Sequence, residues 1–185
     1  MGAILFGRCS CRGHGPLPQM KKTGYAAPAV PVRGEFANVR VALVATRWNT
    51  TIVDALLEGA RSGLADWGVT ARRVDEFRVP GAFEVPLALE QLARTRRYDG
   101  VVALGAVIRG DTPHFDFVAG ECARGLQDVA LRHALPVGFG VLTVNTAAQA
   151  AARAKRGKGN KGYEAASAML EMVRFKRQAG TRGRA

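Results

Sequence analysis

Four short apolar runs alternate along this chain with segments long enough to be helices, and no other feature constrains the fold as strongly. The clearest run is GVVALGAVI, residues 100–108, in which nearly every side chain is apolar. Parallel sheets bury such strands on both faces, because helices cover both sides of the sheet. The same kind of pattern predicts the other three strands over residues 39–48, 69–79 and 137–144.

Helix signals lie between these runs. Asn49 and Thr50 can cap a helix that has Gly68 as its stop. Pro86 falls in the first turn of the next helix, where a proline is tolerated. Helical patterns cover residues 51–68, 82–95, 115–135, 146–156 and 163–175. The alternation predicts an α/β fold: a doubly wound, three-layer sandwich in which helices flank both faces of a four-stranded, mostly parallel sheet.

The ends of the chain differ from this pattern in composition. Residues 1–38 are rich in Gly and Pro, which predicts an extended or disordered arm before one domain over 39–175 and a basic tail over 176–185. The net charge is +12, yet residues 41–152 hold eleven Lys and Arg against twelve Asp and Glu. We interpret the excess as solvated ends rather than a nucleic-acid surface, because only Phe175 interleaves with the basic residues.

Several classes of protein are disfavoured. The three cysteines form neither an even framework nor a paired metal-binding pattern, which favours a reducing compartment and no metal site. No apolar run approaches the roughly 18 residues that span a bilayer, and the first residues make a poor secretory signal. We therefore expect a cytoplasmic protein. Neither GxxxxGK[ST] nor GxGxxG after a strand occurs, so nucleotide cofactors lack their usual motif.

Ligands of doubly wound sheets bind beyond the carboxyl ends of the strands. The turns to examine therefore follow Thr46, Val79, Ile108 and Val144. The first turn carries WN, the second VPGAFEVP and the third RGDTPH, while the fourth leads toward Arg153. All four turns should meet at one edge of the sheet, because the strands are parallel.

The third turn, RGDTPH, is the most polar of the four. Gly110 lets the backbone approach a ligand, and Thr112 with the free N–H groups of a helix start forms an anion nest. A lone histidine at such a place is more often a cap or a surface residue. His114 shares its short turn with the nest, however, and this favours a role in proton transfer.

The other turns carry signals that are weak when taken singly. Trp48 alone would be a core residue more often than a stacking platform, and Glu84 alone would be a solvated carboxylate that suits a helix dipole. The stretch KRGKGNKG, residues 155–162, would usually be a flexible loop. Together, at one edge of the sheet, these signals describe a pocket.

These motifs resemble one enzyme family. RWN, VPGAFEVPLAL, ALGAVIRGDTPHFDFVAGE, GFGVLT, AARA and GNKGYEAA occur in the order and at the spacing of the 6,7-dimethyl-8-ribityllumazine synthases of riboflavin biosynthesis. The resemblance covers about residues 39–173 and implies a flavodoxin-like sandwich. It also implies a condensation, without cofactor, of 5-amino-6-(D-ribitylamino)uracil with 3,4-dihydroxy-2-butanone 4-phosphate, in which phosphate and water are lost.

The resemblance assigns roles to residues at each turn. Trp48 would stack on the pyrimidine, Glu84 would hold ribityl hydroxyls, and His114 would transfer protons. Arg153 would supply a charged fork for phosphate. We add, independently of the resemblance, that Asp116 could orient the imidazole. The expected pyrimidine and ribityl residues are Trp48, Asn49, Ala82, Phe83, Glu84, Val107, Ile108, Phe139 and Lys161. The expected phosphate residues are Gly110, Asp111, Thr112 and Arg153.

Two positions depart from the family pattern. Gly138 stands where a bulkier residue is common. Asp111 places a carboxylate in the phosphate nest, which is unfavourable unless its side chain points away.

The resemblance further implies a homopentamer in which Phe139 reaches into the site of the adjacent subunit. Some members close into an icosahedral 60-mer, and association with riboflavin synthase is a further implied partnership. We expect no cofactor, metal or membrane partner and no nucleic acid.

Two alternatives remain: a noncatalytic flavodoxin-like module that binds nucleotides or RNA, and a shell protein that has lost its chemistry. The basic cluster formed by Arg153, Lys155, Arg156, Lys158 and Lys161 separates the first alternative from the enzyme. A basic cluster inside the pocket would favour the enzyme, whereas a basic cluster on an open face would favour a module that binds nucleic acid.

Overall fold

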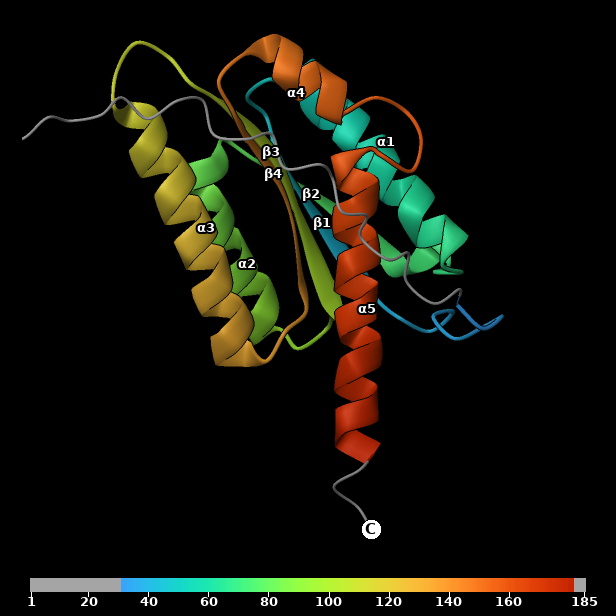
Figure 1. Cartoon of the computed structure of the whole chain (residues 1–185). Coiled ribbons are helices and arrows are strands. Elements are labelled where there is room, and N and C mark those ends of the chain that lie inside the picture. The colour runs from blue at the N-terminus through green and yellow to red at the C-terminus, as the bar shows by residue number, and fades with distance from the viewer. Residues whose placement is uncertain (1–30, 182–185) are drawn as a thin grey trace, which may run out of the picture.

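The computed structural model describes residues 31–181, which form a four-stranded sheet between two layers of helices (Figure 1). The strands are β1 (Val41–Thr46), β2 (Val74–Val79), β3 (Gly100–Ile108) and β4 (Val137–Val144). All pairings are parallel, in the order β2-β1-β3-β4. The predicted fold class is confirmed, and β3 and β4 span the residues that their apolar runs predict.

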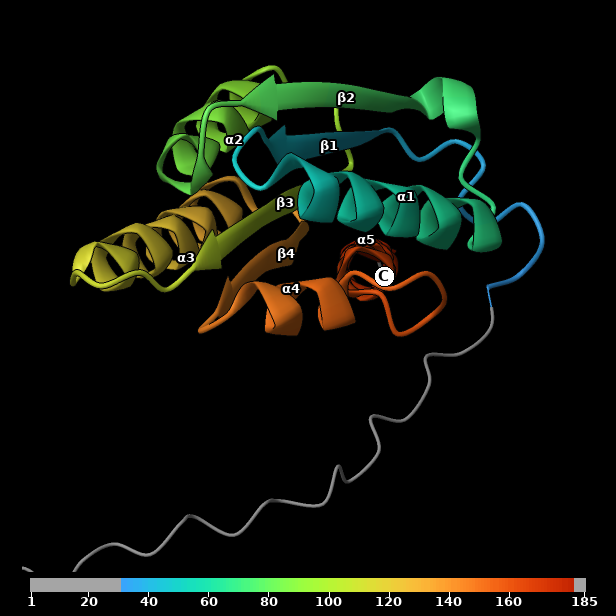
Figure 2. The same cartoon turned by 90° about the horizontal axis from the view of Figure 1, so that it is seen from above.

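Helices cover both faces of the sheet (Figure 2). They are α1 (Thr50–Asp66), α2 (Val85–Arg94), α3 (His114–His133), α4 (Ala147–Arg153) and α5 (Lys161–Thr181), with short 3₁₀ helices η1 (Ala71–Arg73) and η2 (Ala82–Glu84). The pair α2 and α3 covers one face, whereas α1, α4 and α5 cover the other. Within residues 31–181, no helix combines the length and the apolarity needed to cross a bilayer.

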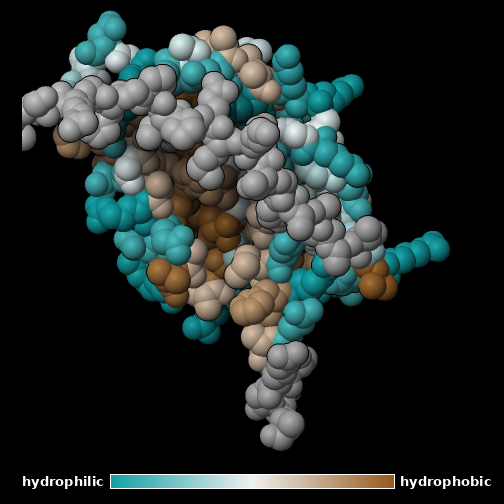
Figure 3. All heavy atoms as spheres, in the orientation of Figure 1, coloured by the Kyte–Doolittle hydropathy of each residue, from teal (hydrophilic) through white to brown (hydrophobic). Residues whose placement is uncertain are grey.

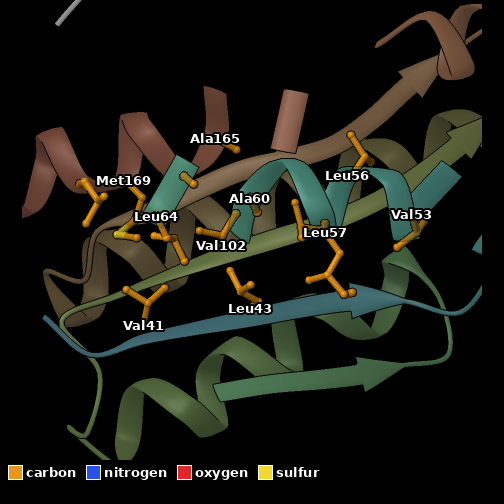
Figure 4. Close-up of a cluster of buried hydrophobic side chains, with 14 of the residues drawn as sticks. Val41, Leu43, Val53, Leu56, Leu57, Ala60, Leu64, Val102, Ala165 and Met169 are labelled. Carbon is orange, nitrogen blue, oxygen red and sulfur yellow. The ribbon is translucent and has the colours of Figure 1, made fainter. Parts of the chain in front are cut away.

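The core consists of two apolar layers, one on each face of the sheet. All six residues of β1 are buried, and they alternate between the layers. Val41 and Leu43 face α1 and α5, whereas Ala42 and Val44 face α2 and α3. Figure 4 shows the first layer, in which the labelled side chains of α1, β1, β3 and α5 point toward one another. Burial on both faces explains why the strand runs are continuously apolar.

The second strand is shorter than predicted. Residues 69–73 were expected to be extended, but Thr70 precedes the 3₁₀ turn η1 and pairing starts at Val74. Val74 lies opposite Val41, the first residue of β1. Earlier residues therefore have no ladder partner, and β-propensity alone does not make a strand at a sheet edge. The second helix is also divided, because residues 82–84 form η2 before α2 begins.

The predicted cap at Asn49 is wrong in its interaction. Asn49 occupies the N-cap position of α1, but its backbone is left-handed (φ 57°) and its side chain caps nothing in the helix. Instead, Asn49 Nδ2 donates to the Ala106 carbonyl oxygen, 2.9 Å away on β3. The adjacent Thr50 hydroxyl donates to the Arg47 carbonyl oxygen at 2.7 Å. The first bond holds the loop after β1 against β3, and the second closes the loop on itself.

The packed domain extends beyond the predicted boundaries at both ends. Phe36, which we assigned to the arm, is fully buried against Trp67. Glu35 forms a bidentate pair with Arg174 at 2.6 and 2.8 Å. Helix α5 continues to Thr181, so most of the expected tail is helical. The remainder of the predicted arm, residues 1–30, lies outside the described residues.

Cys122 lies in the layer between the sheet and the helices α2 and α3. It is a free, buried thiol, and burial raises its pKa to about 11. A thiol with such a pKa is a packing residue rather than a nucleophile. No group of His, Cys, Asp and Glu within residues 31–181 could hold a metal ion.

Candidate active site

A cavity of 660 Å³ opens at the carboxyl edge of the sheet, between the ends of β1 and β3. The chain leaves β1 toward α1 on one face and leaves β3 toward α3 on the other. This divergence makes a switch point, the position at which doubly wound sheets bind ligands. The lining residues are Thr46, Trp48, Asn49, Gly81, Ala82, Phe83, Glu84, Ala106, Val107, Ile108, Gly110, Thr112, His114, Phe115, Phe117 and Val118.

The loop after β1 places Trp48 at the pocket, with 74% of its surface exposed. The Asn49 bond to Ala106 fixes the backbone beside it. A Cβ added to Gly81 would lie 3.2 Å from Trp48 Cδ1, so the indole packs against a position that has no side chain. A large aromatic face held open to solvent favours a stacked ligand.

The second wall is η2, which follows β2. The Glu84 carboxylate accepts from the Gly81 N–H at 2.8 Å and so closes the turn on itself. Ala82 is buried beneath it, whereas Phe83 is 61% exposed. The other carboxylate oxygen of Glu84 remains available to a ligand, because a carboxylate accepts several hydrogen bonds.

The third wall comes from the end of β3 and the start of α3. Val107 and Ile108 are half-buried, and Gly110, Thr112 and His114 lie beyond them in the exposed turn. Helix α3 begins at His114 without a side-chain cap, and the Asp116 N–H donates to the Pro113 carbonyl oxygen at 3.0 Å. His114 and the turn with Gly110 and Thr112 therefore line the same pocket.

Asp116 does not orient the imidazole of His114, contrary to our expectation. Its carboxylate pairs with Arg109 through two bonds of 2.7 and 3.1 Å. Hydrogen bonding from Arg109 lowers the pKa of Asp116. The Arg109 guanidinium also lies 4.1 Å from the centre of the Phe115 ring and donates to Asn145. Arg109 thus holds the turn that carries His114 in place, and Asp116 contributes to this through its ion pair with Arg109.

Four predicted site residues do not line the pocket: Asp111, Phe139, Arg153 and Lys161. Phe139 lies on β4 and is 48% exposed. Arg153 donates to the Gln149 carbonyl oxygen at the end of α4, and Lys161 pairs with Glu164 at the start of α5. Helices α4 and α5 cover the face of the sheet opposite to α2 and α3. Arg153 and Lys161 therefore do not reach this pocket within one subunit.

The basic cluster at 153–161 lies outside the pocket as well, and its members from Lys155 to Lys158 are exposed. By our own criterion, this placement within one subunit favours the nucleic-acid alternative. The choice between the two classes therefore depends on what the rest of the chain matches.

The sequence did not single out the apolar wall formed by the first turns of α3. Phe115, Phe117 and Val118 line the pocket, and Phe117 is 67% exposed. Two aromatic residues at the very start of a helix were the available signal. Thr46 was also missed: it forms part of the floor, and its hydroxyl has no hydrogen-bond partner among the described residues.

Residues 38–177 match the family model of 6,7-dimethyl-8-ribityllumazine synthase. The chain belongs to this family. The match covers all four strands and the whole pocket, so the resemblance seen in the motifs is confirmed. It also decides against a nucleic-acid module as the class of the protein.

Because the chain belongs to the lumazine synthase family, it belongs to a family of riboflavin-biosynthesis enzymes. The family is oligomeric. Its fold is the flavodoxin-like sandwich described above.

Proposed function

We propose that the protein condenses 5-amino-6-(D-ribitylamino)uracil with 3,4-dihydroxy-2-butanone 4-phosphate to 6,7-dimethyl-8-ribityllumazine, releasing phosphate and water. One observation carries the proposal: a single pocket combines a flat aromatic face, a carboxylate, an anion nest and a histidine. These groups match, in kind, a heteroaromatic substrate with a polyol chain and a second substrate that carries phosphate.

The aromatic end of the pocket suits the ribitylaminouracil. Trp48 offers the face on which the pyrimidine stacks, and Val107 and Ile108 frame its edge. Glu84 stands beside Trp48, and its free carboxylate oxygen accepts from ribityl hydroxyls. Ala82 and Phe83 complete this end with backbone groups and an apolar side chain.

The polar end suits the phosphate ester. Gly110 and Thr112 bind the phosphate oxygens through the anion nest. His114 moves protons during imine formation, phosphate elimination and ring closure. The nest and the base must be neighbours, because the protons move next to the departing anion. Asp111 belongs to the nest through its backbone, and its exposed side chain points away from the phosphate in this proposal.

The remaining residues come from a neighbouring subunit of a homopentamer. Phe139, Arg153 and Lys161 lie outside their own pocket. Figure 3 shows apolar side chains gathered between α3 and α5, where the edge strand β4 runs. Exposed apolar residues there suit subunit contact. A second subunit placed on this edge would add the Arg153 fork to the phosphate end and Phe139 and Lys161 to the other.

Incubation of the purified full-length protein with both substrates tests the proposal. We expect lumazine absorbance and inorganic phosphate to appear together and in equal amounts. Omission of either substrate is the control and should abolish both signals. Failure to form lumazine by an assembled protein that still binds the ribitylaminouracil would leave the shell protein as the better interpretation. A nucleic-acid module would bind RNA with strong salt dependence and would form no product.

A further inference from the structure

The link between α4 and α5 is held by one buried side chain, that of Asn160, which is only 1% exposed. Asn160 Nδ2 donates to the Ala55 carbonyl oxygen of α1 at 3.0 Å and to the Ala154 carbonyl oxygen at 2.8 Å. Asn160 Oδ1 accepts from the N–H of Gly162 at 2.8 Å. A single amide therefore ties together the middle of α1, the end of α4 and the first turn of α5.

The surroundings of this amide leave no room for another arrangement. A Cβ added to Gly59 would overlap the amide of Asn160, and one added to Gly162 would overlap the Leu56 carbonyl oxygen. The backbone of Asn160 donates to the Gly157 carbonyl oxygen at 3.0 Å, and Gly157 adopts a φ of 115°. The stretch KRGKGNKG is thus anchored at its end, although its composition suggested a flexible loop.

Both cations of the proposed shared site adjoin this anchor. Arg153 directly precedes Ala154, whose carbonyl oxygen binds the amide, and Lys161 directly follows Asn160. Side-chain bonds add little restraint: within residues 31–181, Arg153 donates to a carbonyl oxygen of its own helix and Lys161 pairs with Glu164 one turn on. The backbone that Asn160 holds therefore sets where both cations stand.

We propose that Asn160 is the positioning residue of the phosphate site: it sets the placement of Arg153, together with Lys161, as the two cations are presented to the neighbouring pocket. This inference rests on the proposed function. An asparagine suits the place because its amide supplies two donors for two carbonyl oxygens and one acceptor for a helix start. An aspartate of equal size would turn an acceptor toward those same carbonyl oxygens.

Asn160→Asp in the full-length, assembled enzyme tests the proposal. At pH 8 we expect KM for the butanone phosphate to rise about tenfold, or about 1.4 kcal/mol, because the carboxylate can donate to neither the Ala55 nor the Ala154 carbonyl oxygen. Turnover and KM for the ribitylaminouracil, at whose end of the neighbouring pocket Lys161 stands in this proposal, should change less than about twofold, because the carboxylate still accepts from the Gly162 N–H next to Lys161. The introduced carboxyl is buried, so its pKa is raised, and acidification toward pH 6 should restore one donor and narrow the difference from wild type.

Two further variants make the result specific. Leu170→Ala removes a fully buried side chain from the same helix α5 and should lower the melting temperature without changing either KM selectively. Asn160→Ser keeps a donor and an acceptor with less reach, and it should show the same selective rise in KM. Equal rises in both KM values, or a pattern identical to that of Leu170→Ala, would overturn the positioning role.

Arg153→Ala separates this inference from the proposed function. A large rise in KM for the butanone phosphate with Arg153→Ala, but none with either Asn160 variant, would refute the inference alone. No effect of Arg153→Ala would refute the phosphate role of Arg153 and the inference together.

Discussion

His114 lines the pocket together with Gly110 and Thr112, and the neighbouring Asp116 pairs with Arg109 rather than with the imidazole. We predict that His114→Ala lowers kcat about 10²–10⁴-fold with little change in either KM, as expected for a general acid–base group. Initial rates of lumazine absorbance measure this effect. His133→Ala is the matched control, because His133 contacts Glu90 outside the pocket. An unchanged rate for His114→Ala would remove the imidazole from the mechanism.

Thr46 is a second single residue whose surroundings predict a measurable effect. Its hydroxyl is buried in the pocket floor without a partner among residues 31–181, and an unpaired buried hydroxyl costs free energy. Thr46→Val keeps the shape and removes the hydroxyl, so the free energy of unfolding should rise by about 1 kcal/mol. Urea denaturation of the ligand-free protein measures it. A loss of stability would mean that a water or a bound molecule satisfies the hydroxyl.

Between elements, α5 approaches the backbone of β4 closely. Gly138 and Gly140 face α5, and a Cβ at Gly138 would overlap the Ala165 carbonyl oxygen. This contact explains why the chain has a glycine at position 138, since α5 lies directly on the strand backbone. Side chains alternate between the two faces of a strand. Phe139, which lies between Gly138 and Gly140, therefore points to the face opposite α5, where it is exposed.

Gly138→Ala should therefore destabilise the fold by about 1–3 kcal/mol, because the helix must move away from the sheet. Chemical denaturation measures the difference. Gly120→Ala is the control: Gly120 is exposed in the middle of α3 with open space where a Cβ would go, and alanine there should stabilise by about 0.5–1 kcal/mol. Equal effects of both changes would contradict the close packing of α5 on β4.

The segment before β1 is tied to α5 by Glu35 and Arg174, both mostly buried. Hydrogen bonding from Arg174 lowers the pKa of Glu35 below its ordinary value of 4.5. The pair therefore contributes its full stability above pH 4.5 and loses it as the pH falls through the lower, folded-state pKa. Glu35→Gln should be less stable than wild type at pH 7, and thermal unfolding should show the two converging in acid. A constant difference at all pH values would exclude the ion pair as its cause.

At the scale of the whole molecule, the proposed site is incomplete within one subunit, because Phe139, Arg153 and Lys161 do not line its pocket. Mixed assemblies test this arrangement. Co-assembly of His114→Ala with Arg153→Ala subunits should restore about a quarter of the wild-type activity, since head-to-tail contacts pair an intact pocket with an intact Arg153 at random. His114→Ala mixed with Glu84→Ala is the control and should restore none, because both residues line one pocket.

The assembly itself should be a pentamer, and the short, anchored link between α4 and α5 is compatible with closure into a 60-subunit shell. Basic residues near the chain ends repel when copies converge, more strongly at low salt. Mass photometry across a salt series measures this: shells should increase with salt, and pentamers alone at every salt concentration would refute closure. A stable, active monomer would refute the shared site as well.

The sequence by itself determined the fold class, the carboxyl edge as the place of the pocket and most of the residues that line it. The bounds of β3 and β4 follow from apolar runs alone, because burial on both faces makes composition a local signal of position. Likewise, the turns after β1, β2 and β3 meet wherever parallel strands end together.

Only the tertiary structure decided which partner each polar side chain has. Asn49 binds Ala106, 57 residues away, rather than the adjacent helix, and Asp116 binds Arg109 rather than His114. The start of β2 depends on where β1 begins, and the place of Arg153 depends on which face α4 covers. A polar side chain has several possible hydrogen-bond partners within its own segment. Partners from distant segments come within reach only when the elements pack together, so the packing decides which partner the side chain binds.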